Sequence, residues 1–304
     1  MSASTARILG MIDEVYYTPQ IVAFRLGFFR DEGLDAEFTV GDITELPRAV
    51  TVGEADFALC GLWQPWLYAE RLNAPLAAFA ELNQQVPLFL FGRVPAEEFD
   101  WSSLNGGTVH HTSVMVASRW CALQELFRRR ASTLEPFVSS SGVSPPRRAS
   151  CSGLAAATCW SSSALARRRC SPTRTLITLS AGGTDLGTLP WSIYYTSRDR
   201  LRDRRREAVA VTRAPSRALQ WVSDHSAEEI TQVVAPSFPT VDEADVHLLV
   251  EFFLAQEQWP ATPAQDRESD ERWRGLLMRS GVLAHGAPRA EIVAEEIAAE
   301  AIAG

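Results

Sequence analysis

The stretch that decides the fold is MIDEVYYTPQIVAFRLGFFRDEG, residues 11–33. It begins at the end of an apolar segment, Arg7–Ile12, which we predict to be a strand. A polar and aromatic loop, Asp13–Thr18, follows this strand. Pro19 stands where the first turn of a helix tolerates a missing N–H, and we expect the helix that follows to end at Gly33. The loop of this strand–loop–helix unit lies at the carboxyl end of a sheet strand, where open α/β sheets bind small ligands.

The same alternation of strand and helix continues through the first third of the chain. Further strands are predicted at Leu34–Val40, Asp56–Gly61, Leu76–Glu81 and Leu88–Arg93, and a helix at Glu45–Val52. The second and third strands of this list end in the loops Leu62–Trp66 and Leu82–Gln85. Strands that alternate with helices at this spacing predict a mainly parallel sheet.

The composition argues against nucleic acid and against a membrane span. The 304 residues are 46% hydrophobic with a formal charge of −8, so there is no basic surface for a nucleic-acid partner. All 29 basic residues are arginine, because the chain has no lysine. No apolar run reaches the length of a membrane span, and the N-terminal residues lack the pattern of a signal peptide. As written, the sequence predicts a cytoplasmic location.

Several longer stretches together resemble one known family. They are LGFFRDEGLDAEF at 26–38, VGEADFALCG at 52–61, PLAAFAELNQQVPLFLFGR at 75–93, FDWSSLNGGTV at 99–109, LPWSIYYTSRDRL at 189–201 and SFPTVDEADVHLLVEFF at 237–253. The chain is similar in these stretches to the SsuA/THI5-like (NMT1) family of ABC-transporter solute-binding proteins. The resemblance covers roughly residues 7–130 and 183–300.

The resemblance implies an α/β fold of the two-lobed, type II periplasmic-binding-protein kind, with mainly parallel sheets and a helical C-terminal third. Lobe 1 would comprise residues 1–90 plus 190–304 and lobe 2 residues 91–189, with a small ligand held between them. It also implies an ABC permease and ATPase as partners, no cofactor, and the periplasmic or extracellular membrane-associated location usual in the family. We expect a monomer.

The segment 131–181 departs from this pattern. Serine, arginine, proline and small residues dominate it, Glu135 is its only acid, and it holds three of the five cysteines. No helical or strand period is evident. One interpretation is a solvated serine-rich insertion. The other, which we favour, is a shifted reading frame, because reading the segment in another frame with GC-rich codons yields a helix, a glycine turn and an apolar strand in the expected order.

Residues with the chemistry of a binding site follow the predicted strands. They are Tyr16, Tyr17 and Thr18 in the first loop, Trp63 and Gln64, with Trp66, in the second, and Asn83 and Gln84 in the third. Loops at one edge of a sheet converge, so we expect these side chains to line one cleft. Aromatic faces with a few amides and hydroxyls suit a planar organic ligand. Any single ring can instead pack in the core.

Two further groups are candidates for the ligand site. His111, Thr112 and Ser113 follow a strand at Thr108–Val109 and precede a helix at Val116–Arg128. Hydroxyls and N–H groups at a helix N-terminus suit a carboxylate, sulfonate or phosphate, although a simple helix cap is the alternative. Adjacent histidines on a strand end point to opposite sides, so we predict no metal site. Trp191 and Tyr194 are expected on the strand that returns to the first lobe. Trp191 is our first candidate for a residue that faces the cleft and Tyr194 our second, and packing in the core is the alternative for both.

Cytosolic enzymes of the same superfamily are the alternative to a binding protein. A desulfinase would use a cysteine nucleophile, for which Cys60 is the candidate, whereas Cys121 lies in a helix with an apolar face. A buried structural thiol is the competing interpretation of Cys60, because no base lies near it in the sequence. Thiamine-pyrimidine synthesis resembles pyridoxal-phosphate chemistry that needs a lysine, which this chain lacks. We therefore assign no catalytic residue and predict a solute-binding protein for a thiamine-precursor pyrimidine or a sulfonate-, nitrate- or taurine-like anion.

Overall fold

The structure is a computed structural model that describes residues 3–11, 14–87, 89–92, 100–101, 108–110, 116–130, 138–140, 175–178 and 186–303. The chain divides into two compact units. Unit 1 comprises Met1–Gln85 and Thr188–Gly304, and unit 2 comprises Val86–Gly187. The chain therefore leaves unit 1 once, after its first 85 residues, and returns to it once.

Unit 1 is built on a five-stranded sheet with the order β2-β1-β3-β9-β4. The strands are β1 (Ser4–Gly10), β2 (Leu34–Val40), β3 (Phe57–Cys60), β4 (Leu76–Asn83) and β9 (Ser192–Ser197). β1 pairs in parallel with both β2 and β3, while β9 is antiparallel to β3 and to β4. β4 consequently runs in the same direction as the first three strands. Every residue of β3, β4 and β9 is buried, as expected for strands covered on both faces.

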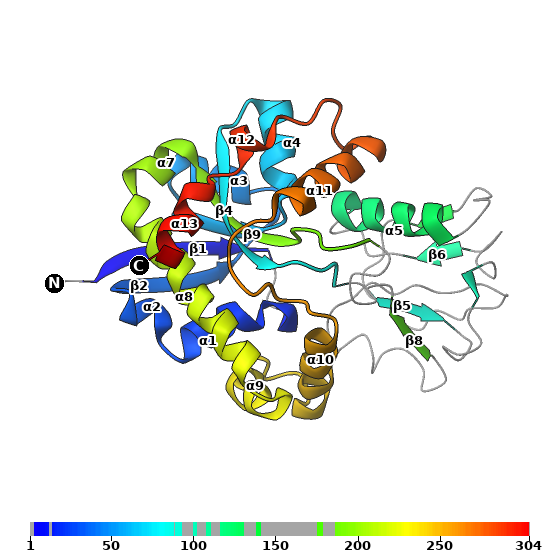
Figure 1. The fold of residues 1–304 in the computed structure, drawn as a ribbon, viewed down its shortest axis with the longest axis horizontal. Coiled ribbons are helices and arrows are strands. Elements are labelled where there is room, and N and C mark those ends of the chain that lie inside the picture. The colour runs from blue at the N-terminus through cyan, green and yellow to red at the C-terminus, as the bar shows by residue number, and fades with distance from the viewer. Residues whose placement is uncertain are drawn as a thin grey trace. The chain divides into compact units, whose positions relative to one another are not determined.

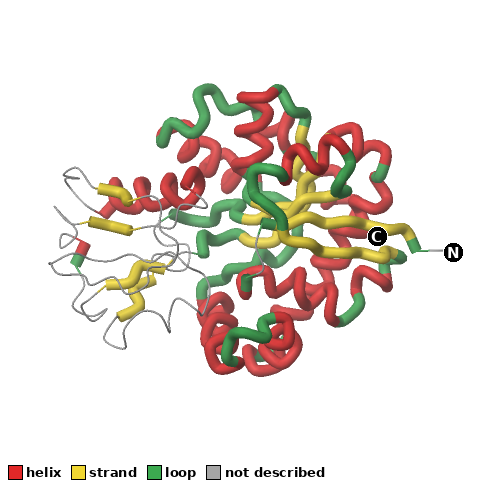
Figure 2. Tube along the Cα trace, turned by 180° about the vertical axis from the view of Figure 1, so that it is seen from behind, coloured by secondary structure: helices red, strands yellow, loops and turns green. Residues whose placement is uncertain are grey.

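Helices cover both faces of this sheet (Figures 1 and 2). They are α1 (Thr18–Arg25), α2 (Phe28–Asp31), α3 (Leu46–Val52), α4 (Trp63–Leu72), α7 (Arg198–Asp203), α8 (Arg205–Asp224), α9 (Ala227–Val234), α10 (Glu243–Ala255), α11 (Arg267–Arg279), α12 (Arg289–Ile292) and α13 (Glu295–Ala303), with the short 3-10 helices η1 (Val15–Tyr17) and η5 (Ala235–Ser237). Figure 1 shows α1, α8, α9 and α10 on one side of the sheet and α3, α4 and α11 on the other. A capping box formed by Ser226 and Glu229, a spacing that the sequence itself displays, begins α9.

Three sequence-based expectations about helices are wrong. The first helix does not continue to Gly33: α1 ends at Arg25, because Gly27 adopts φ 78°, and α2 follows. The expected loop Leu62–Trp66 is largely the first turn of α4. Pro215 also does not end a helix, although proline inside a helical stretch predicts a break, because α8 continues through it. Pro215 lies on the buried face of α8, which packs against α1 and α13, and this packing outweighs the hydrogen bond that proline removes.

The C-terminal third also completes the open side of β4. Glu81 N donates to Pro263 O at 2.8 Å, Gln84 N to Gln258 O at 3.0 Å, and Ala294 N to Ala78 O at 2.8 Å. These bonds occupy backbone groups that an edge strand would otherwise leave open.

Unit 2 contains α5 (Val116–Arg130) and two short ladders. β5 (Phe89–Gly92) pairs antiparallel with β8 (Thr175–Thr178), and β6 (Thr108–His110) pairs in parallel with β7 (Val138–Ser140). Strands were predicted at β5 and β6, whereas β7 and β8 lie in the segment for which no strand was predicted. Both are too short to show a side-chain period and are defined by their backbone pairing.

Candidate functional site

Several strand ends meet at one edge of the unit 1 sheet, which we call the carboxyl edge. It is formed by Gly10, Cys60 and Asn83, the last residues of β1, β3 and β4, and by Ser192, the first residue of β9. The strand register brings these ends together, since Gly10 pairs with Leu59 and Asn83 with Ser192. Most of the predicted site residues of unit 1 follow these strand ends.

The first loop contributes Tyr16, Tyr17 and Thr18, all of them buried. The rings of Tyr16 and Tyr17 lie 4.4 Å apart, and Thr18 Oγ1 donates to Val15 O at 2.7 Å. Trp259 Nε1 donates to Tyr16 O at 2.8 Å, so a residue from the C-terminal third fixes this loop. The loop is therefore held by contacts from its own turn and from the chain after α10.

The pKa of the Tyr17 hydroxyl is raised well above its ordinary value. Burial is the main cause, and the neighbouring Cys60 adds to it, while hydrogen bonds with the hydroxyls of Ser192 and Tyr16 partly offset the shift. Tyr17 is thus a neutral hydroxyl beside those of Ser192 and Tyr16, and the nearby carboxyl of Glu14 raises its pKa further.

The first turn of α4 contributes Trp63 and Gln64. Trp63 is half-buried, and a Cβ on Gly61 would lie 2.5 Å from its ring, so this ring requires glycine at position 61. Gln64 is fully buried: its Oε1 accepts from Tyr195 Oη at 2.8 Å and its Nε2 donates to Ile43 O at 2.6 Å. Gln64 therefore ties α4 to the sheet and to the loop after β2.

The end of β4 contributes Asn83 and Gln84. Asn83 O accepts from Trp191 N at 2.8 Å, and Gln84 O accepts from Leu189 N at 2.9 Å, so the two segments by which the chain leaves and re-enters unit 1 are paired. Gln84 Nε2 donates to Glu257 O at 3.0 Å. Asn83, Gln84 and Trp191 thus lie together at the carboxyl edge.

The two candidates on and before β9 have different surroundings. The ring of Trp191 lies 6.1 Å from that of Trp273 on α11. Tyr194 is fully buried, stacks on Phe79 with ring centroids 6.3 Å apart, and donates from Oη to Gln20 Oε1 at 2.7 Å. Tyr194 therefore packs between the sheet and α1. The predicted residues His111, Thr112 and Ser113 lie outside the described residues, and their role stays a prediction.

Residues outside the predicted site complete this arrangement. Gln20 accepts a hydrogen bond from Tyr194, and Ser192 bonds to Tyr17. Trp259 donates to the first loop, and Gln258 donates to the segment at the end of β4. The signal that the sequence offered for the last two was the Trp259–Pro260 pair, because proline marks a loop or the end of a helix.

Cys60 lies at this edge as a buried free thiol. Burial raises its pKa to about 12, and a hydrogen bond from the Gly61 N–H only partly offsets this. The group is therefore a neutral thiol near neutral pH, whereas a cysteine nucleophile reacts as the thiolate. Cys121 on α5 is also buried.

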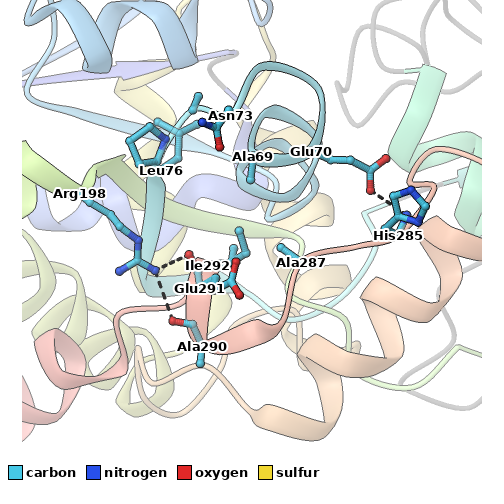
Figure 3. A pocket seen from close by; sticks show the side chains of 12 residues that line it. Ala69, Glu70, Asn73, Leu76, Arg198, His285, Ala287, Ala290, Glu291 and Ile292 are labelled. Carbon is cyan, nitrogen blue, oxygen red and sulfur yellow. Dashed lines mark hydrogen bonds between the residues drawn. The ribbon is translucent and has the colours of Figure 1, made fainter.

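A separate cavity of about 560 Å³ lies in unit 1. Its lining includes Leu76, the first residue of β4, and Arg198, which follows the last residue of β9, so it lies at the opposite, amino edge of the sheet. Figure 3 shows the Arg198 guanidinium held by the carbonyls of Ala290 and Glu291. No residue predicted for the ligand site lines this cavity.

Metal-ligand clusters and membrane-spanning helices are both absent from the described residues. No group of three or more His, Cys, Asp or Glu side chains in that part of the chain is arranged to hold a metal ion. Among the helices described, none combines the length and the apolar character needed to cross a bilayer.

Known proteins share both the sequence pattern and the fold. Residues 14–109 match the family described as NMT1/THI5 like. Over 303 residues the chain is 24% identical to the putative binding protein YtlA of Bacillus subtilis (strain 168), a match that covers 96% of this chain and 88% of the relative.

Solved structures extend the similarity in fold. The putative periplasmic sulfonate-binding protein SsuA of Methylobacillus flagellatus KT aligns with a TM-score of 0.70 at 13% identity, covering 99% of this chain and 94% of that one. The alkanesulfonate-binding protein SsuA of Xanthomonas axonopodis pv. citri, bound to MOPS, gives 0.66 at 13% identity, with coverages of 99% and 98%. The desulfurization enzyme DszB gives 0.57 at 15% identity and covers 99% of each chain. The predicted fold class and the predicted resemblance are confirmed: the chain has the α/β periplasmic-binding-protein fold, and residues 14–109 match the NMT1/THI5-like family model.

Proposed function

We propose that this protein is the solute-binding component of an ABC-type import system and that it holds a small organic solute at the carboxyl edge of unit 1. The observation that carries the proposal is the linked cluster Tyr16, Asn83, Gln84 and Trp191, which joins aromatic rings and amides from three separate segments at one sheet edge. Open α/β sheets bind ligands at such an edge. The likeness to proteins named as binding proteins, one of them of a putative sulfonate ABC transporter, supports the same role, with a permease as partner.

The ligand we favour is a planar heterocycle of the thiamine-precursor pyrimidine type. The described loops at the carboxyl edge (14–18, 41–45, 61–66, 83–87, 188–191 and 256–265) contain aromatic, amide, hydroxyl and carboxyl side chains but no arginine. Arg272 on α11 reaches this edge, but its guanidinium donates to Thr188 O and to Glu268. An anion would therefore rely mainly on neutral N–H donors of these loops, whereas a neutral or weakly basic ring can stack on the aromatic faces. Sulfonate, taurine and nitrate are the competing ligands.

A thermal-shift experiment on the wild-type protein tests both parts of this proposal. The probes are 4-amino-5-hydroxymethyl-2-methylpyrimidine, taurine, MOPS and nitrate. A ligand at a hundred times its Kd stabilises the folded state by about 2.7 kcal/mol, enough to raise Tm by roughly 5 °C. We expect this shift for the pyrimidine, its loss in Trp191→Ala, and its retention in Trp221→Ala, a matched tryptophan on α8. A shift with the anions alone would overturn the ligand class, and no shift with any probe would count against the binding function.

The enzyme alternative is tested at Cys60. Its pKa of about 12 and its burial favour a structural thiol. We expect no turnover of aryl or alkyl sulfinates by the wild type. Turnover that disappears in Cys60→Ser would overturn the assignment as a binding protein.

A further inference from the structure

Gln258 connects the C-terminal third of unit 1 with the end of β4. It follows α10 and is 1% exposed. The preceding residue, Glu257, has φ 50°, which turns the chain out of the helix. Gln258 O accepts from Gln84 N at 3.0 Å, so backbone bonds place its side chain beside the last residues of β4.

Both amide hydrogens of Gln258 have acceptors. Nε2 donates to Gln85 O at 2.8 Å and to Asn83 Oδ1 at 3.3 Å. A primary amide has two donors and an ionised carboxylate has none, so glutamine suits this position and glutamate does not. These contacts fix which end of the Asn83 amide is the acceptor that faces Gln258.

The orientation of Asn83 leaves a donor available. Since Oδ1 accepts from Gln258, the other end of the amide is Nδ2, which is fully buried and has no hydrogen-bond partner among the described residues. A buried donor without a partner costs free energy that a ligand acceptor would recover. Asn83 is also the last residue of β4, and its carbonyl accepts from Trp191 N, so the donor lies within the cluster at the carboxyl edge.

We propose that Gln258 is a positioning residue of the ligand site: it fixes the Asn83 amide so that Nδ2 donates to an acceptor atom of the bound solute. The inference rests on the proposed function and adds a requirement to it. The solute must carry an acceptor, such as a ring nitrogen or a sulfonate oxygen, where it meets Asn83. A solute with only donors at that position would meet the wrong end of the amide.

Two substitutions remove the donor in different ways. Gln258→Glu at about pH 8 cannot donate to Asn83, so the Asn83 amide is free to turn over and present Oδ1. Asn83→Asp keeps an acceptor for Gln258 but has no N–H. In both variants the new carboxyl regains one donor when it is protonated, and burial raises the pKa of such a group. Affinity lost at about pH 8 is thus expected to return at about pH 5.

The experiment measures the Kd of the probe that stabilises the wild type, by calorimetric titration at the two pH values. We expect Kd to rise about tenfold or more at the higher pH in both variants and to return to within about threefold of the wild type at the lower one. Gln232→Glu, an exposed glutamine on α9, is the matched control and is expected to bind like the wild type at both. Circular dichroism confirms that each variant is folded.

The wild type at both pH values is the reference for other groups that titrate nearby. Those on the elements packed here are Glu81 on β4, Glu14 before η1, Glu257 after α10, Asp266 at the N-cap of α11 and Asp270 on α11. Their contribution is common to all proteins compared.

Each outcome decides one claim. A Kd within twofold of the wild type in Gln258→Glu at the higher pH overturns the positioning role and leaves the proposed function intact. A loss of affinity that is the same at both pH values assigns Gln258 a structural role only. If Gln258→Glu does not fold at the higher pH, Asn83→Asp decides, and unchanged binding in that variant overturns the inference. Absence of binding by the wild type itself would overturn the proposed function.

Discussion

The two edges of the unit 1 sheet differ in the charge of their buried polar groups. At the amino edge, Asp56 is 2% exposed and its carboxylate is contacted by Arg7, Arg200 and Arg204 at 2.6–3.1 Å. At the carboxyl edge most of the buried polar groups are hydroxyls and amides, several of which bond to one another, and they lie with the Cys60 thiol and the carboxyl of Glu14. Arginines surround the buried carboxylate at the amino edge, whereas neutral groups predominate at the carboxyl edge.

The difference separates what holds the fold from what is available to a ligand. Burial by itself would raise the pKa of Asp56, but hydrogen bonds from Arg7 and Arg204 outweigh it, and the pKa of this carboxyl is lowered. Burial raises the pKa of Glu81 near the carboxyl edge, and the charges of Asp270 and Asp266 raise it further. A carboxylate is thus stabilised at the amino edge and disfavoured near the carboxyl edge.

The largest effect is expected from Asp56→Asn. This change leaves three arginines around a buried amide, and we expect the free energy of unfolding to fall by about 2–3 kcal/mol at pH 7, less than for a fully buried pair because the arginines reach solvent. Urea unfolding measures it. Glu54→Gln, which removes an exposed partner of Arg48, is the control and is expected to cause no measurable change.

The loss of unfolding free energy in Asp56→Asn is expected to depend on pH. Because the folded-state pKa of Asp56 is lowered, its contribution is fully present above its unfolded pKa of about 3.9 and is lost as the pH falls through the folded value. The difference between wild type and Asp56→Asn is therefore expected to shrink below about pH 4. A difference independent of pH would show that Asp56 does not act through its charge.

A change of opposite sign is expected for Glu81→Gln. A carboxyl with a raised folded-state pKa binds its proton more tightly when folded, so its contribution falls as the pH rises from the unfolded pKa of about 4.3 toward the folded value. We expect the variant to be more stable than the wild type by about 1–2 kcal/mol at about pH 8 and equal to it at about pH 4. Urea unfolding at the two pH values checks this. Destabilisation at the higher pH would break the contrast between the edges.

The smallest effect is expected from Tyr194→Phe. It removes the donor to Gln20 Oε1 and leaves a buried acceptor without its partner, which costs about 1 kcal/mol of unfolding free energy. Tyr68→Phe, whose hydroxyl donates to Thr44 O at the surface, is the matched control with a smaller expected loss. Equal losses in the two variants would show that burial at this edge does not strengthen neutral hydrogen bonds.

Much of the fold was predictable because local patterns coincide with packing. Leu34–Val40 is β2 as predicted, and the capping box at Ser226 is present, because both signals are local. The break at Gly27 and the continuation of α8 through Pro215 were not predicted, since packing against other helices decides them. The shifted reading frame in residues 131–181 and the lobe boundaries stay predictions. The DNA across codons 125–190 tests the first.

The candidate site was predictable only in part. Strand ends located Tyr16, Tyr17, Asn83 and Trp191, because topology brings such ends to one edge. The bond between Tyr194 and Gln20 was not predictable, because alternation along a strand defines two faces but does not show which element covers each face. Gln258 and Trp259 were missed because their partners lie more than 170 residues away in the chain.

The position of β9 between β3 and β4 has a consequence for biosynthesis. While the ribosome is still making the intervening residues, β3 and β4 have no strand to join them, and two open backbone edges face the cytosol or a chaperone. The sheet can close only once residues 192–197 have emerged, so a nascent chain that ends earlier remains prone to aggregation.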